Sequence, residues 1–430
     1  MKIAVIGSGI AGMSAAHTLA AQQHEVHLYE ASARLGGHTA TLDVDDNGKQ
    51  LAVDTGFIVY NDHTYPLFIE LMDSLKVANR PTDMSFSVSD ALSGLEYAGS
   101  DLNSLFAQRR NLVSPRFWRL LRDILRFNRE AEPDLLRDPA LANETLGHYL
   151  REFHYSPEFR DYYLIPMGAA IWSSNHDTLE QFPFGFFVRF FRNHGLLQIS
   201  NRPQWRTVLG GSRQYIGPLT DNFRHNIHLS TPVLQVQRQV LHHGVKKVCL
   251  TLRRGQEFFD QVIFACHSDQ ALKLLADPTP AEVEVLDAIP YTRNEVVLHT
   301  DTSMLPRNRR TWSSWNVSLG RTGTDKPGLT YNMNILQGLE SRQTWCVTLN
   351  QTALIREECI HATCHYEHPL FTLDGIKAQQ RWSDINGQLD TWYCGAWWRN
   401  GFHEDGVWSA RRVTDALQLQ LDASALATAI

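Results

Sequence analysis

A glycine-rich stretch suited to contact a ligand through its backbone lies near the start of the chain, in Gly7-Ser8-Gly9-Ile10-Ala11-Gly12. Gly9 has no Cβ, so an anionic ligand can approach the backbone there, and the N–H groups of a following helix would bind its phosphates. Glu30 follows at the distance along the chain where a carboxylate can accept hydrogen bonds from a ribose. Phosphate binding beside ribose binding indicates a dinucleotide site.

Three short elements must position these groups. The apolar run Lys2–Ile6 predicts a strand, the alanine-rich residues Met13–Ala21 predict a helix, and Val26–Glu30 predicts a second strand. Strand, glycine turn, helix and strand make the βαβ unit that holds a dinucleotide at the carboxyl ends of its strands. The sequence therefore predicts an α/β fold that begins with a Rossmann-like unit.

A second glycine-rich loop narrows the choice of dinucleotide. Glu30 is followed by Arg34-Leu35-Gly36-Gly37-His38, and this spacing resembles the extended fingerprint of the flavin-containing amine oxidase superfamily. The resemblance implies non-covalent FAD, bound by three separate stretches of the chain. In the first stretch the implied contacts are Gly7, Ser8, Gly9, Ile10, Ala11, Gly12, Glu30, Ala31, Arg34, Gly36, Gly37, His38, Thr39, Thr55, Gly56 and Phe57.

Two later stretches resemble the other FAD-binding pieces of that superfamily. Gly210-Gly211 resembles its second glycine motif, after which a strand would present backbone amide groups of Val233 to the adenine. A strand that ends near Gly395 and a helix expected over Ser409–Leu419 resemble the third piece. In the superfamily this piece faces the flavin, which implies contacts from Gly395, Asp405, Gly406 and Val407.

The resemblance also implies the architecture. We expect a Rossmann-like FAD-binding domain of the amine oxidase or glutathione-reductase-like type, with an inserted substrate domain of helices and a mixed sheet. The FAD-binding domain would comprise residues 1–85, 205–285 and 385–430, and the substrate or cap domain residues 86–204 and 286–384. Two intertwined domains agree with a length of 430 residues, which is long for one hydrophobic core.

Longer strings resemble a bacterial subfamily usually described as predicted NAD/FAD-binding proteins or FAD-dependent oxidoreductases. They include Val53–Asn61, Asp83–Val88, Phe106–Leu112, Pro166–Ser173, Arg202–Arg206 and Gly401–Gly406. Genes of this subfamily commonly lie near genes that resemble cyclopropane-fatty-acid synthases. The association implies membrane lipid acyl chains as substrates, although no residue type by itself indicates them.

Composition excludes several other classes of protein. With 43% hydrophobic and 20% charged residues, the chain resembles soluble globular proteins, and its net charge of −6 argues against a nucleic-acid partner. Six cysteines without regular pairing indicate reduced thiols. No apolar run approaches the ~18 residues of a transmembrane helix. We expect a cytoplasmic protein that is either free or peripherally bound to the inner face of the membrane.

Two segments allow both a structural and a functional interpretation. After Leu102 a helical pattern alternates apolar residues with Arg109, Arg110, Arg116, Arg119, Arg122 and Arg126. These arginines form either a solvated helix face or a patch for anionic phospholipid headgroups. The aromatic run Phe182–Arg192 is either core or the wall of an apolar substrate tunnel.

Catalytic groups are harder to assign, because flavin oxidations need a path for a hydride or proton near N5 and often little else from the protein. His38 stands where many superfamily members carry Arg or Lys, so it is a candidate acid or base, or it orients the FAD diphosphate. His403 is the second candidate, and it could instead shape the FAD loop. Tyr60, Trp172 and Trp315 are candidates for the substrate pocket.

A cluster of cysteines and histidines raises the question of zinc, namely Cys359, His361, Cys364, His365 and His368. The same segment predicts a strand, whose alternation sends Cys364 and His365 to opposite faces. We therefore expect no metal site. Cys394 is the cysteine nearest a proposed FAD segment, and nothing in the sequence marks it as a covalent anchor.

These observations together predict an FAD-dependent oxidoreductase. The leading hypothesis is oxidation, desaturation or isomerisation of an apolar substrate, with a fatty acyl chain or lipid as the expected case, by hydride transfer to flavin N5. One alternative is a flavin amine oxidase that releases peroxide. Another is a flavin-binding scaffold without catalytic activity.

Overall fold

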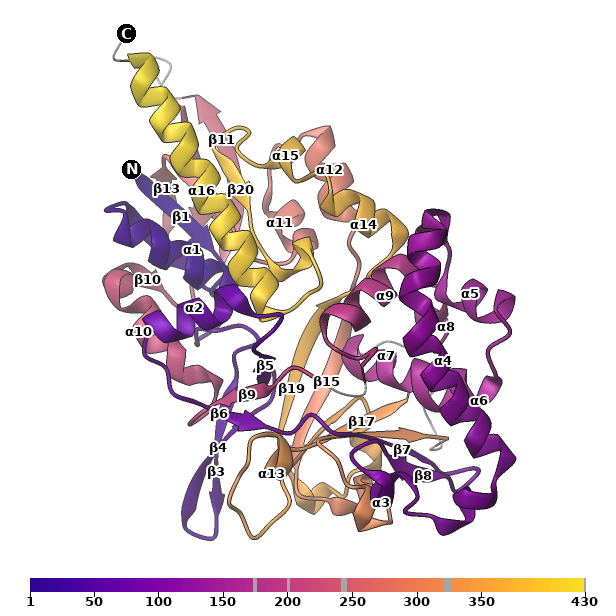
Figure 1. The fold of residues 1–430 in the computed structure, drawn as a ribbon. Coiled ribbons are helices and arrows are strands. Elements are labelled where there is room, and N and C mark those ends of the chain that lie inside the picture. Colours follow the sequence, from indigo (N-terminus) through magenta and orange to yellow (C-terminus); the bar gives the residue numbers. More distant parts are fainter. Residues whose placement is uncertain (173–175, 199–201, 241–245, 321–326, 429–430) are drawn as a thin grey trace.

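The computed structural model describes residues 1–172, 176–198, 202–240, 246–320 and 327–428. Two large sheets organise the chain, one in the upper left and one in the lower centre of Figure 1. Within the described ranges, no helix has the length and hydropathy that crossing a bilayer requires. All six cysteines are free.

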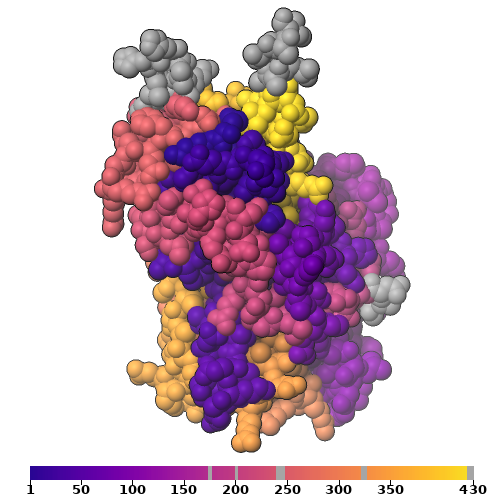
Figure 2. All heavy atoms as spheres, turned by 90° about the vertical axis from the view of Figure 1, so that its left-hand side faces the viewer, coloured from indigo at the N-terminus to yellow at the C-terminus, as the bar shows by residue number. Residues whose placement is uncertain are grey.

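The first sheet is parallel and has five strands. Their order is β10 (Ile227–His228), β2 (Glu25–Tyr29), β1 (Lys2–Ile6), β14 (Gln261–Phe264) and β20 (Thr391–Tyr393). Residues 3–6 of β1 are all buried, as expected of a central strand that is covered on both faces. Figure 2 shows the indigo, pink and yellow parts of the chain side by side around this sheet. Three distant stretches therefore build one unit, and their strands all end at the same edge.

Helices and a smaller sheet cover this unit. Helix α1 (Ile10–Ala21) packs against the long C-terminal helix α16 (His403–Thr428). An antiparallel sheet of β11 (Val233–Val240), β12 (Lys246–Leu252) and β13 (Gly255–Phe259) shares the same hydrophobic core. Shorter helices complete the cover, namely α2 (Pro66–Ser74), α10 (Ile216–Thr220), α11 (Ser268–Leu274), α12 (Pro280–Asp287), α14 (Leu373–Gln379) and α15 (Trp382–Ile385).

The second large sheet is mixed, as the sequence predicts. Its order is β19 (Ile360–Pro369), β15 (Tyr291–His299), β18 (Cys346–Leu349), β17 (Gly328–Asn332), β16 (Trp315–Leu319), β7 (Phe86–Asp90) and β8 (Glu96–Ala98). Only the pairing of β16 with β7 is parallel among these described strands. Helix α13 (Met333–Leu336) follows β17.

Helices of the segment between β8 and β9 (Trp205–Val208) pack against that sheet. They are α3 (Leu102–Leu105), α4 (Pro115–Arg137), α5 (Leu146–Glu152), α6 (Pro157–Phe159), α7 (Ile165–Trp172), α8 (His176–Glu180) and α9 (Phe184–Asn193). Ser114 caps α4, and Pro115 occupies its first turn. The spacing of Phe117, Leu120 and Leu125 in the sequence predicts one apolar helix face; Phe117 and Leu120 are buried, but Leu125 is 53% exposed and does not belong to that face.

Two small antiparallel units join the large sheets. The hairpin of β3 (Thr41–Asp46) and β4 (Lys49–Asp54) turns at Asn47 and Gly48, whose positive φ angles of 55° and 90° are those that an Asn-Gly pair adopts readily. Strand β9 pairs with both β5 (Val59–Asn61) and β6 (Asn79–Thr82).

The C-terminal helix begins earlier than expected. It starts at His403 rather than Ser409, because Glu404 and Asp405 suit the positive end of a helix and Gly406 packs tightly against α1. Asp405, Gly406 and Val407 therefore lie in its first turns and not in a loop before it. The expected domain boundaries stay a prediction, and they include some residues outside the described ranges, such as 173–175 and 429–430.

Candidate functional site

The turn between β1 and α1 leaves space for a ligand above its backbone. Gly7 has a φ of +106°, which favours glycine, and a Cβ on Gly12 would lie 2.0 Å from the Gly7 carbonyl oxygen. A Cβ on Gly9, in contrast, would meet no protein atom within 4 Å. No described side chain caps the start of α1, so its first N–H groups remain available to an anion.

The second glycine-rich loop lies against the first. The Gly36 N–H donates to the Ser8 carbonyl oxygen at 3.0 Å, and a Cβ on Gly37 would come within 3.4 Å of the Gly9 Cα. The Arg34 guanidinium donates to the carbonyl oxygens of Gly37 at 2.8 Å and Thr39 at 3.1 Å. These contacts make the two loops one continuous surface.

Glu30 is fixed at the edge of this surface. Its carboxylate accepts from the N–H and hydroxyl of Ser8 at 3.0 and 2.6 Å and from those of Ser32, both at 2.8 Å. The Thr231 N–H donates to the Glu30 carbonyl oxygen at 2.9 Å. This pairing brings the start of β11, at Val233, to the same side of the site as Glu30 and the exposed Ala31.

The third stretch completes the edge of the sheet. After β20 the Gly395 N–H donates to the Ser409 hydroxyl at 2.8 Å. A Cβ on Gly406 would lie 2.6 Å from the Cγ2 atom of Ile10, so the N-terminal ends of α1 and α16 abut. Two positive helix ends therefore lie beside the same edge.

His403 lies where the three stretches meet. Its ring stacks on Phe57 with centroids 3.6 Å apart, and its Nε2 atom lies 3.2 Å from the Thr39 hydroxyl and 3.1 Å from the Tyr215 hydroxyl. Burial lowers the pKa of His403 to about 3, so the ring is neutral at pH 7. The Phe57 N–H donates to the His38 carbonyl oxygen at 2.8 Å, which ties the second loop to this point.

His38 lies beside the mixed sheet. Its ring centroid is 5.1 Å from those of both Tyr366 and His368, and Tyr366 shares a 2.8 Å hydrogen bond with the Thr55 hydroxyl. Burial and the neighbouring histidines hold the pKa of His38 well below its usual value. The Nε2 atom of His38 is buried and has no hydrogen-bond partner among the described residues, so it suits a ligand that supplies one.

His368 is a site residue that the sequence analysis missed, because it was considered only as part of a metal cluster. The Asn350 amide donates to Asn294 at 2.7 Å, and the Asn294 amide donates to the His368 Nδ1 atom at 2.9 Å. A donor at Nδ1 places the ring proton on Nε2. Side chains alternate between the two faces of β19, so His368 lies on the same face as Tyr366; this alternation could have identified His368 from the sequence. In the part of the chain that the structure describes, no three metal-ligating side chains come together.

The aromatic residues predicted for a substrate pocket lie in three different hydrophobic clusters. Tyr60 packs against Phe68 with ring centroids 5.1 Å apart, and Trp172 against Phe190 at 4.7 Å. Trp315 is half-buried on the mixed sheet. Their shared role in one pocket stays a prediction.

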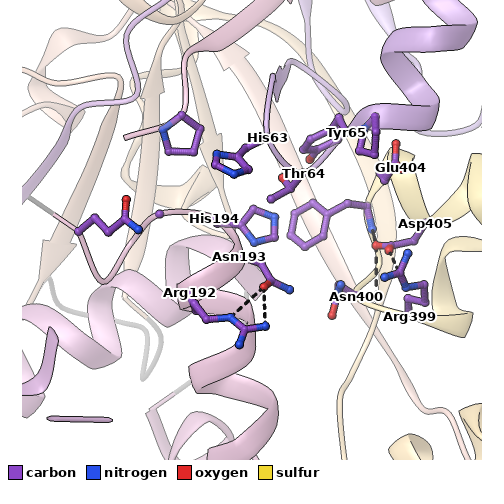
Figure 3. Close-up of a pocket in the computed structure, with 15 residues that line it drawn as sticks. His63, Thr64, Tyr65, Arg192, Asn193, His194, Arg399, Asn400, Glu404 and Asp405 are labelled. Carbon is purple, nitrogen blue, oxygen red and sulfur yellow. Dashed lines mark hydrogen bonds and ion pairs between the residues drawn. The ribbon is translucent and has the colours of Figure 1, made fainter. Parts of the chain in front are cut away.

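A cavity of about 470 Å³ opens between the end of α9 and the loop before α16. Arg192, His194 and His63 line it on one side, and Arg399 and Asp405 on the other (Figure 3).

The walls of this cavity combine rings with charged groups. Phe402 stacks on Phe190 with centroids 5.4 Å apart, so the aromatic core of the helical segment reaches the cavity. The Asp405 carboxylate accepts from the N–H groups of Phe402 and Asn400 at 3.0 and 3.2 Å. Burial raises the pKa of Asp405 to about 7. The nearest approach of the Arg399 guanidinium to that carboxylate is a loose 3.8 Å.

A family model described as flavin containing amine oxidoreductase matches residues 10–333. The chain belongs to this family. The cofactor of a flavin amine oxidoreductase is FAD, and the protein is an FAD-dependent oxidoreductase. The observed geometry fits that cofactor, because the open space above Gly9, the uncapped start of α1 and the unpartnered Nε2 of His38 are all suited to a phosphate-bearing ligand.

Individual relatives of this flavin amine oxidoreductase show the fold. Cyclohexylamine oxidase from Brevibacterium oxydans IH-35A superposes with a TM-score of 0.70 at 15% identity and covers 98% of this chain and 99% of its own. The fatty acid isomerase from P. acnes that produces CLA superposes with a TM-score of 0.64 at 12% identity, covering 97% of each chain. These matches confirm the predicted fold class.

One curated relative shares a shorter stretch at higher identity. The carotenoid phi-ring synthase of Chlorobaculum tepidum is 42% identical over 66 residues. This match spans 15% of the chain and only 10% of the synthase, so it says little about the rest of either protein.

Proposed function

We propose that FAD lies across the carboxyl edge of the five-stranded sheet and that the enzyme acts on an apolar chain with an anionic end, such as a fatty acid or a phospholipid acyl chain. The pyrophosphate lies at the start of α1 near Gly9, and the adenosine lies between Glu30 and Val233. The flavin lies toward the start of α16. The open space at Gly9 and the two abutting helix ends support this arrangement.

The residues that line the 470 Å³ cavity are the main support for this substrate class. Arg399 and Arg192, the latter also paired with Glu132 at 3.0 Å, supply guanidinium groups that suit a carboxylate or a phosphate. Phe402, stacked on Phe190, supplies an apolar wall for a hydrocarbon chain. The fold is shared with a fatty acid isomerase, which is compatible with a substrate of this kind.

The same cavity is poorly suited to a protonated amine. Glu404 accepts from the N–H groups of Leu67 and Phe68 at 3.2 and 2.8 Å, and Asp405 accepts from two further N–H groups. Both carboxylates in the wall are therefore held by backbone donors. A positive substrate would also meet Arg192 and Arg399.

In the proposed reaction, bound FAD supplies a hydride acceptor for a substrate carbon. The arginines hold the anionic end, and the aromatic wall keeps water away from the hydrocarbon. His38 and His403 act as neutral rings that orient the cofactor by hydrogen bonding, in place of the acid–base role that the sequence left open. We further propose that the enzyme is cytoplasmic and reaches acyl chains of the membrane.

The test is anaerobic addition of candidate substrates to the holoprotein, with flavin absorbance as the readout. We expect a free unsaturated fatty acid or a phospholipid to bleach the flavin or to leave with a changed double bond. Arg399→Gln should raise the concentration that is required, and Arg411→Gln, on the exposed side of α16, should not. Bleaching and peroxide release with amines, and no effect of acyl chains, would overturn the substrate assignment.

A further inference from the structure

The surface at the start of α4 exposes three apolar side chains that touch or adjoin one another. Val113 is 83% exposed, Leu112 48% and Trp118 50%. The Trp118 indole N–H donates to the Leu112 carbonyl oxygen at 2.8 Å, which holds the indole against the preceding turn. We call Leu112, Val113 and Trp118 the apolar tip.

Four arginines flank this tip along the chain, and we call them the arginine collar: Arg109, Arg110, Arg116 and Arg119. Arg109 and Arg110 donate to carbonyl oxygens of Phe106 and Gly94, each at 2.8 Å. Arg116 and Arg119 share one carboxylate, that of Glu158, at 4.0 and 3.5 Å.

The collar therefore carries an excess of positive charge. Among the ion pairs of the described residues, its four guanidinium groups meet a single carboxylate. The chain as a whole has a net charge of −6, so this positive surface is a local feature.

We propose that the apolar tip and the arginine collar dock the protein onto the surface of an anionic phospholipid bilayer. Tryptophan with aliphatic side chains enters the boundary between headgroups and acyl chains, and arginines bind the phosphates around it. Nucleic acid would engage the collar but would leave Leu112 and Val113 without a function. The docking rests on the proposed function for its purpose, since it would bring the enzyme to a surface that contains acyl chains.

The test is sedimentation of the holoprotein with vesicles of phosphatidylcholine alone and of phosphatidylcholine mixed with phosphatidylglycerol. Wild-type protein should bind the anionic vesicles and stay in solution with the neutral ones. Arg109→Gln/Arg110→Gln should weaken binding by about 30-fold, because each arginine near an anionic surface contributes about 1 kcal/mol. Val113→Ser/Trp118→Ser should weaken it by about tenfold or more.

Matched variants elsewhere on the surface serve as controls. Arg253→Gln/Arg254→Gln alters another adjacent, exposed arginine pair, and Leu419→Ser alters an exposed leucine of α16. Both should bind as wild type does, and all variants should keep the flavin spectrum and the Tm of the wild type.

Two results would overturn the docking. One is that wild-type protein does not sediment with anionic vesicles in this assay, and the other is that the tip and collar variants bind these vesicles as well as the control variants do. The assay involves no turnover. Vesicle binding without any effect of acyl chains on the flavin would support the docking and contradict the proposed substrate.

Discussion

Replacing Gly9 should separate cofactor binding from folding. A side chain at this position meets no protein atom within 4 Å of its Cβ, and the φ angle of −64° suits any residue. In Gly9→Val the apoprotein should therefore lose no more than about 1 kcal/mol, the cost of a poorer helix N-cap. The valine instead fills the space that we assign to the pyrophosphate. Losing one charge-assisted hydrogen bond costs about 1.5–3 kcal/mol, which raises the Kd for FAD by about 10- to 150-fold.

Gly12→Ala is the matched contrast, because its added Cβ meets protein. It would lie 2.0 Å from the Gly7 carbonyl oxygen and 3.0 Å from the Ala265 Cβ atom. The turn must move to admit it, at a cost of about 1–3 kcal/mol to the apoprotein.

Both effects can be measured on the same samples. Apoprotein is titrated with FAD by flavin fluorescence, and the Tm of the apoprotein is recorded without cofactor. Gly9→Val should raise only the Kd for FAD, whereas Gly12→Ala should also lower the Tm of the apoprotein. The pyrophosphate does not lie at Gly9 if Gly9→Val binds FAD with wild-type affinity, and position 9 is not open if the Gly9→Val apoprotein is as unstable as that of Gly12→Ala.

Three further predictions concern buried charged and polar groups. Glu282→Leu should destabilise the protein by about 3 kcal/mol, because it removes the buried partner of Arg238 at 2.9 Å and leaves only the half-exposed Asp277 at 3.0 Å. Glu284→Leu on the same helix removes an exposed ion pair and should cost less than about 1 kcal/mol; equal Tm values for the two would refute this. The pKa of Asp405 is raised from 3.8 to about 7, so its contribution to stability is full below 3.8 and is lost as pH rises through 7. The apoprotein should thus lose up to about 4 kcal/mol across that range, and Asp405→Asn, followed by Tm against pH, should remove the loss; an unchanged slope would count against it. His403→Phe should weaken FAD binding without moving the pH optimum, because a ring with a pKa of about 3 does not titrate near pH 7; a displaced pH–rate profile would instead restore its acid–base role.

Local signals made much of the FAD side predictable. Gly7 and the Asn47-Gly48 turn need backbone angles that glycine or asparagine adopts readily, and their spacing from apolar runs identifies the flanking strands. Strand β1 has the predicted bounds, α1 starts three residues earlier than predicted, and β2 is shifted by one residue toward the N-terminus. The start of α16 was missed because Gly406 reads as a helix breaker, and only its distant neighbour Ile10 explains why it is tolerated.

Long-range contacts made the substrate side unpredictable. Trp172 and Phe190 have the same residue chemistry whether they fill a core or line a tunnel, and only their packing distinguishes the two. His368 acquires its fixed tautomer from Asn294 on another strand. The cavity brings Arg192 and Arg399 together from segments far apart in the chain, and no spacing rule connects them.

Analysis of the reaction products shows whether the enzyme acts on an acyl chain with an anionic end. Holoprotein is incubated with a free unsaturated fatty acid, with phospholipid vesicles and with primary amines, and the products are analysed by mass spectrometry. We expect acyl chains with a new or displaced double bond, and unchanged amines. Unchanged acyl chains together with aldehyde and peroxide from the amines would show that the enzyme is instead an amine oxidase.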